Sequence, residues 1–183
     1  MAIISGVILK SKFIQSTGKE FSSYIDYIDR ETAVRNDMYS SFSLYNEYML
    51  NSEKSSGLFT DTKNSLTSEE IKMLKQSFEK SQKKGSLMWQ NVISFDNRWL
   101  EELGVYNSKT GYIDESKVRN ITRLSTKEML DKKGMISSSI WSASIHYNTD
   151  NIHIHIAIVE PNPVTKRGMI KQKDMEKMKS KVV

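Results

Sequence analysis

The chain has 183 residues, of which 38% are hydrophobic and 27% charged, a balance typical of one soluble globular domain. It has no cysteine, which excludes disulfides and thiolate chemistry and fits the reducing cytoplasm, where we expect the protein to act. No apolar run approaches the roughly 20 residues of a membrane span, and the net charge of +5 is compatible with an anionic partner such as nucleic acid.

The first third of the chain predicts a strand followed by a helix. Residues 2–13 have a continuous apolar centre, which is typical of an inner strand of a sheet. Residues 19–30 predict a helix because apolar side chains recur there at helical spacing. Tyr24 and Tyr27 are three residues apart on this helix, so they lie close together on its surface. Residues 31–63 show no clear pattern.

The rest of the chain predicts a helix and then five further elements. Thr67 and Glu70 have the spacing of a capping box, so a helix is expected from there to about residue 82. The later elements are a strand, a short helix, a long amphipathic helix, a β-hairpin and a charged helix, over residues 87–95, 98–103, 116–133, 140–159 and 171–181.

This order predicts an α+β domain with a central antiparallel β-sheet and helices packed on one face. We expect residues 1–183 to form a single domain. The chain stops within its charged last helix, so we expect it to be the N-terminal part of a longer protein.

The hairpin contains all three histidines of the chain, His146, His153 and His155. Residues 147–151 have turn chemistry, and if Tyr147 pairs with Ile152, then His146 lies opposite His153. Side chains alternate along a strand, so His155 shares the face of His153. The three imidazoles therefore meet on one sheet face, which predicts a site for a catalytic metal ion. The softness of imidazole as a ligand does not fix the metal, and zinc, manganese, nickel and cobalt all stay possible.

A metal site of this kind needs a second reactive group. Cysteine is absent and the histidines are used as ligands, so the candidate nucleophiles are hydroxyls. Tyr24 and Tyr27 follow the first strand, and either could attack a metal-bound phosphodiester. The alternative is that both pack against the sheet, and the residues alone leave this choice open.

Two motifs resemble those of the HUH endonucleases, specifically the relaxases that nick plasmid DNA for conjugation. His146-(x6)-His153-Ile154-His155 resembles their histidine motif, and Asp26-Tyr27-Ile28-Asp29-Arg30-Glu31 resembles the tyrosine motif of mobilisation relaxases. With the segment Trp89 to Asp96, the chain is most similar to the MobL-type relaxases of Gram-positive plasmids. Rolling-circle initiators of the same superfamily place their histidines before the tyrosine.

The resemblance implies an HUH fold and metal-dependent nicking of single-stranded DNA at an origin of transfer. The expected products are a 5′-phosphotyrosyl adduct on Tyr27, with Tyr24 as the alternative, and a free 3′-hydroxyl. The family uses Mn²⁺ or Mg²⁺, and its partners are relaxosome accessory proteins and a coupling protein.

Other site residues and other functions stay open on the sequence. Arg30, Lys166 and Arg167 are candidate DNA contacts because they follow the tyrosine and histidine motifs. Asp96, Glu160 and Glu31 are the candidate acidic helpers for the tyrosine or a histidine. The alternatives to a relaxase are a rolling-circle replication initiator or transposase of the HUH superfamily, and a non-catalytic, metal-stabilised DNA-binding module.

Overall fold

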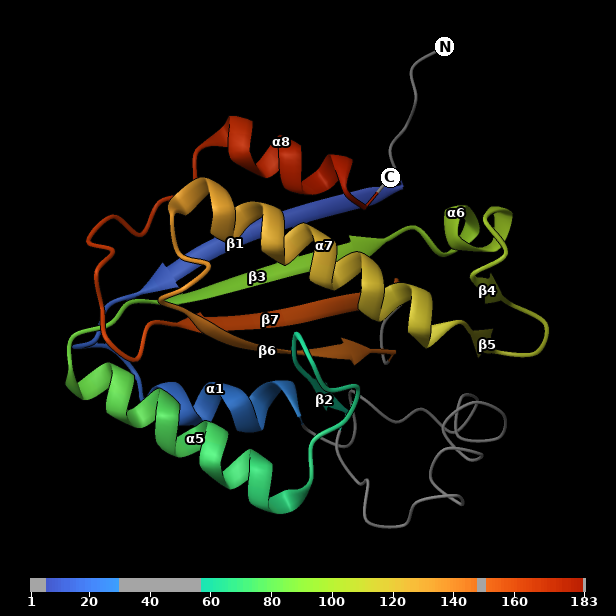
Figure 1. Cartoon of the computed structure of the whole chain (residues 1–183). Coiled ribbons are helices and arrows are strands. Elements are labelled where there is room, and N and C mark those ends of the chain that lie inside the picture. Colours follow the sequence, from blue (N-terminus) through green and yellow to red (C-terminus); the bar gives the residue numbers. More distant parts are fainter. Residues whose placement is uncertain (1–5, 30–56, 148–150, 183) are drawn as a thin grey trace.

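The computed structural model describes residues 6–29, 57–147 and 151–182. These residues form a five-stranded antiparallel sheet in the order β1-β3-β7-β6-β2 (Figure 1). In that order the strands are Val7–Ile14, Met88–Phe95, His153–Val159, Ile140–His146 and Leu58–Phe59. The predicted α+β class with a central antiparallel sheet is confirmed. Two short strands, β4 (Tyr106–Asn107) and β5 (Tyr112–Ile113), form a separate hairpin.

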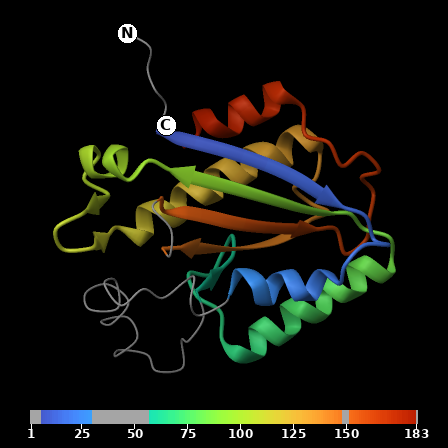
Figure 2. The same ribbon diagram turned by 180° about the vertical axis from the view of Figure 1, so that it is seen from behind.

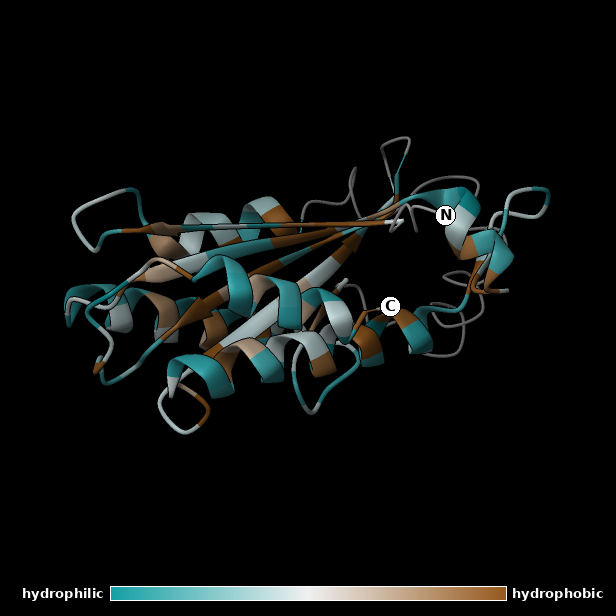
Figure 3. Ribbon diagram, turned by 90° about the horizontal axis from the view of Figure 1, so that it is seen from above, coloured by the Kyte–Doolittle hydropathy of each residue, from teal (hydrophilic) through white to brown (hydrophobic). Residues whose placement is uncertain are grey.

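The helices lie on both faces of the sheet, whereas the sequence predicted one. The helices α7 (Glu115–Lys133) and α8 (Gln172–Ser180) cover the face opposite the histidines, and α6 (Asn97–Glu102) packs at one end. On the histidine face lie α1 (Phe21–Ile28) and α5 (Ser68–Lys83). The strands are largely hydrophobic, whereas the helices mix hydrophilic and hydrophobic residues (Figure 3). Both layers of helices can therefore bury one side against the sheet.

The helix α1 packs on the histidine face because its apolar residues match an apolar patch of the strands. Phe21, Ile25 and Ile28 are fully buried in a cluster with Ala157 and Val159 of β7. This patch lies towards the end of β7, beyond the histidines. Seen from behind, no described helix covers this face over β1 and β3 (Figure 2).

In the sheet that the described residues form, β1 is an edge strand, so the prediction of an inner strand is wrong. Its apolar run misled the prediction because Ile8, which lies on the uncovered face, is 59% exposed. Val7 and Leu9 point to the other face and contribute to the core. Residues 2–5 of the predicted strand lie outside the described residues.

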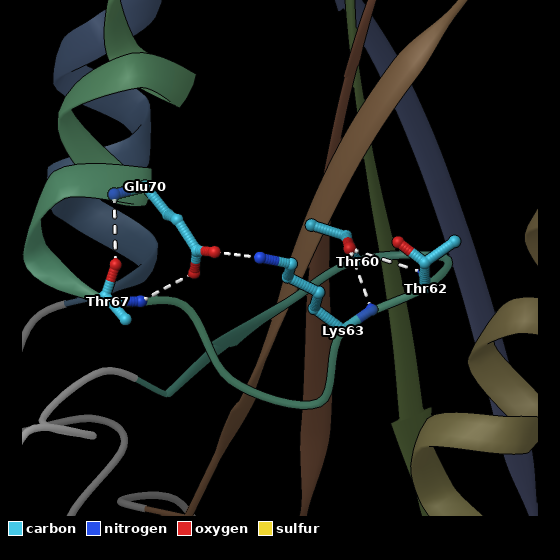
Figure 4. Close-up of polar contacts among 5 residues, drawn as sticks. All are labelled: Thr60, Thr62, Lys63, Thr67 and Glu70. Atoms are coloured by element: carbon cyan, nitrogen blue, oxygen red, sulfur yellow. Dashed lines mark hydrogen bonds and ion pairs between the residues drawn. The ribbon is translucent and has the colours of Figure 1, made fainter.

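A capping box begins α5, as predicted (Figure 4). The Thr67 hydroxyl accepts a hydrogen bond from the Glu70 backbone N–H (3.3 Å), and the Glu70 carboxylate accepts one from the Thr67 N–H (2.9 Å). Lys63 also donates to Glu70, while the Thr60 hydroxyl accepts from the Lys63 N–H. The turn after β2 is thereby tied to the helix that supports α1.

Replacing Thr67 by alanine is expected to lower the free energy of unfolding by about 1 kcal/mol, because the first turn of α5 loses its cap. Urea unfolding followed by circular dichroism measures this loss. Ser68→Ala, one residue along in the same turn, is the matched control and should change stability by much less. Equal losses in both variants would contradict the role of the cap.

Candidate active site

The β6–β7 hairpin brings the three histidines together, as predicted. His146 pairs with His153 across the strands, and His155 pairs with Ser144. The ring centroids are 5.2 Å apart for His146 and His153, 5.0 Å for His153 and His155, and 4.4 Å for His146 and His155. One nitrogen from each ring lies within 4.8 Å of the other two. Three neutral imidazoles at this spacing fit a divalent metal ion.

Hydrogen bonds at the outer ring nitrogens set the tautomers of two histidines. His146 is fully buried, and its Nε2 lies 2.7 Å from the Ile28 carbonyl oxygen at the end of α1. His153 Nδ1 lies 3.1 Å from the Asn151 carbonyl oxygen. A carbonyl only accepts, so each of these nitrogens carries the proton, and the lone pair lies on His146 Nδ1 and His153 Nε2. Such outer partners are typical of metal-binding histidines.

The third histidine contacts the two tyrosines of α1. The Tyr24 hydroxyl lies 3.3 Å from His155 Nδ1. The Tyr27 ring stacks on Tyr24 at 5.7 Å and meets the His155 ring edge-on, also at 5.7 Å. Both candidate nucleophiles therefore adjoin the histidine cluster, and α1 is joined to the hairpin at Tyr24 and at Ile28.

The two tyrosines differ in their environments. Tyr27 is 44% exposed, whereas Tyr24 is mostly covered. Burial raises the pKa of the Tyr24 phenol well above its usual value, and repulsion from Tyr27 adds to the shift. Tyr24 therefore keeps its proton at neutral pH, and its hydroxyl oxygen can accept a hydrogen bond from His155 Nδ1–H.

The candidate acidic helpers within the described residues have structural partners. Asp96 caps α6 by accepting from the Arg98 N–H (2.8 Å), and its hydrogen bonds with Arg98 hold its pKa below the usual value. Glu160 is fully buried at the far end of β7, where it accepts from Ser138 (2.7 Å) and from the Thr165 N–H (3.0 Å). At about 3.3 Å per residue, Glu160 is about 17 Å along the strand from His155. Glu31 lies outside the described residues.

The structure does not bring the basic pair Lys166 and Arg167 to the histidines. Their segment packs against the start of β3, where the Trp89 indole donates to the Gly168 carbonyl (2.7 Å). The Arg167 carbonyl accepts from Lys133, near the end of α7. The histidines lie at the other end of β3, where Ser94 pairs with His153. Arg30 lies outside the described residues.

Sequence reasoning missed the basic residues that the structure does place beside the site. Lys10 and Lys12 are on β1, on the same sheet face as the histidines. The alternation of Lys10 and Lys12 with Leu9 and Ser11 could have indicated a strand with one exposed, basic face. The prediction of an inner strand, buried on both faces, left this pattern unused. Ser144, buried next to His155, was missed as well.

Comparison with known proteins finds one family. The model of the MobL relaxases matches residues 4–183, almost the whole chain. No curated protein and no solved structure matches the chain. In the part of the chain that the structure describes, every helix is too short or too polar to cross a membrane.

Proposed function

Because this chain belongs to the MobL relaxase family, we propose that it nicks single-stranded DNA at an origin of transfer by tyrosine transesterification. Membership of the family makes it a DNA relaxase of conjugation and mobilisation. The proposal adds the chemistry, the nucleophile and the ligands. The observation that carries it is the contact of Tyr27, an exposed tyrosine, with His155 of the histidine cluster.

We propose that His146, His153 and His155 hold one divalent metal ion, Mn²⁺ or Mg²⁺. The fit rests on the three nitrogens within 4.8 Å of one another and on the tautomers that the Ile28 and Asn151 carbonyls impose. When bound, such an ion supplies charge withdrawal from a non-bridging phosphate oxygen and fixes the phosphate for in-line attack. The choice of Mn²⁺ or Mg²⁺ follows the family resemblance.

Tyr27 supplies the nucleophile in this proposal. Its phenol gives up its proton as the oxygen attacks the phosphorus, the bond from phosphorus to the 3′-oxygen breaks, and the 3′-oxygen leaves and takes up one proton, so no proton is gained or lost overall. The products are a 5′-phosphotyrosine and a free 3′-hydroxyl. One phosphodiester bond replaces another, so the reverse attack by a 3′-hydroxyl rejoins the strand.

Tyr24 is the less suitable nucleophile because its hydroxyl is engaged and buried. Its contact with His155 and its raised pKa favour a protonated phenol that orients the imidazole. With His155 Nδ1–H donating to the Tyr24 oxygen, Nε2 of His155 keeps the lone pair that a metal ion would need. Tyr24 is thus a positioning residue in this scheme.

Replacing Tyr24 by phenylalanine is expected to weaken Mn²⁺ binding by about 10-fold, the lower end of the effect of such outer partners. Isothermal titration calorimetry of Mn²⁺ into the protein measures this without any nicking. Tyr27→Phe is the matched control because it also removes one hydroxyl from α1, and it should leave the affinity unchanged. Equal affinity in wild type and Tyr24→Phe would contradict the positioning role.

The test of the function is direct. The protein is incubated with Mn²⁺ and end-labelled single-stranded DNA that carries the origin of transfer, and the products are separated on a denaturing gel. A slow-migrating covalent adduct together with a cleaved strand is the expected result. DNA binding without an adduct would favour a non-catalytic DNA-binding module.

In cells, relaxosome accessory proteins and a coupling protein are the proposed partners.

A further inference from the structure

The uncovered part of the histidine face forms a groove of about 900 Å³ between β1, β3 and the start of α1. One end is lined by His155, Tyr24 and Tyr27, the proposed reaction centre. The rest of the lining includes Lys10 and Lys12 of β1 and Lys19 just before α1. The groove thus leads from the proposed nucleophile to a set of lysines.

The strand pairing fixes the distance between the lysines and the histidines. Lys10 pairs with Val92, and Val92 pairs with His155, so Lys10 lies in the cross-strand row of His155. Neighbouring strands are about 4.8 Å apart, so two strand spacings put Lys10 about 10 Å from His155. Lys12 lies in the next row, with Gln90 and Ala157. Both ammonium groups are therefore within reach of the groove floor.

The charges in the groove are mostly positive. Lys10, Lys12 and Lys19 are exposed, and none of them forms an ion pair within the described residues. Glu20 is the only acidic residue among the described residues of the lining. The exposed ring of Tyr27 adds an aromatic surface on which a base can stack.

We propose that this groove binds the backbone of the single-stranded DNA segment adjoining the cleaved phosphate, with Lys10 and Lys12 contacting its phosphates. The inference rests on the proposed nicking function and places the strand over β1 and β3, away from Lys166 and Arg167. The basic lining and the aromatic side chain at its end are the two features that single-stranded DNA sites combine. The volume lies near the upper end for ligand pockets, so it suits a short single-stranded segment.

The test compares two double variants that remove the same charge. Lys10→Gln/Lys12→Gln changes the groove, and Lys166→Gln/Arg167→Gln changes the basic pair at the other end of the sheet. The affinity of the full chain for a fluorescent single-stranded origin oligonucleotide is measured by anisotropy at several salt concentrations, with EDTA present to prevent cleavage. Circular dichroism confirms that each variant is folded.

The groove variant is expected to bind about tenfold more weakly at low salt, with a salt slope lower by about 1.4, since each lost phosphate contact of a single strand contributes about 0.7. The control variant should keep the wild-type affinity and slope. Equal losses in both variants, or no loss in the groove variant, would overturn the inference and leave the nicking function standing. A wild-type protein that binds no single-stranded DNA would overturn both.

Discussion

Replacing Tyr27 by phenylalanine is expected to abolish the covalent protein–DNA adduct, because among the described tyrosines only Tyr27 is both exposed and in contact with the histidine cluster. The ring remains, so its contacts with Tyr24 and His155 and the fold of α1 are preserved. Denaturing gel electrophoresis of the reaction with labelled origin DNA measures the adduct. We expect a loss of at least about 1,000-fold, since the reaction loses its nucleophile.

Tyr24→Phe is the control that separates the two tyrosines. This variant should still form an adduct when Mn²⁺ is in excess, because it lacks only the group that orients His155. Mass spectrometry of the wild-type adduct should find the DNA on Tyr27. DNA on Tyr24, or an adduct that persists in Tyr27→Phe and vanishes in Tyr24→Phe, would reverse the assignment.

The sequence predicted the histidine cluster because that cluster depends on local rules. Turn chemistry after His146 and the alternation of side chains along a strand are enough to set the His146–His153 register. The capping box of α5 was predictable for the same reason: Thr67 acts within one turn of its own helix.

The surroundings of the cluster depend on tertiary packing, which the sequence pattern does not specify. Ile8 continues an apolar run, yet it faces an uncovered side of an edge strand. Lys166 follows the histidine strand closely along the chain, but the two ends of an extended strand lie far apart. Nearness in sequence to the histidine strand therefore did not predict nearness to the histidines, whereas the pairing of β1 with β3 brings Lys10 into the cross-strand row of His155.

The sequence pattern likewise could not predict that α1 covers part of the histidine face. Three apolar residues predicted that this helix packs against something, but both sheet faces were possible. The outcome depends on the small and apolar patch of Ala157, Val159 and Met88, which faces α1. Once the helix is seated there, the Ile28 carbonyl meets His146 and the Tyr24 hydroxyl meets His155.

Removing any one of the three histidines is expected to abolish nicking, but His146 and His153 should differ in their effect on stability. His146→Ala removes a fully buried ring and the donor to the Ile28 carbonyl, so we expect it to lower the free energy of unfolding by about 1–3 kcal/mol. His153 is partly exposed, so His153→Ala should leave the free energy of unfolding of the metal-free protein nearly unchanged.

Three measurements check this expectation: nicking of labelled DNA with Mn²⁺, calorimetric titration of Mn²⁺, and urea unfolding in EDTA. Loss of nicking and of Mn²⁺ binding in His153→Ala, with unchanged unfolding, assigns the effect to the metal site and not to the fold. EDTA treatment of the wild type should stop nicking, and added Mn²⁺ should restore it. Nicking that survives both chelation and His153→Ala would remove the histidine cluster from the reaction and leave it a purely structural link between the hairpin and α1.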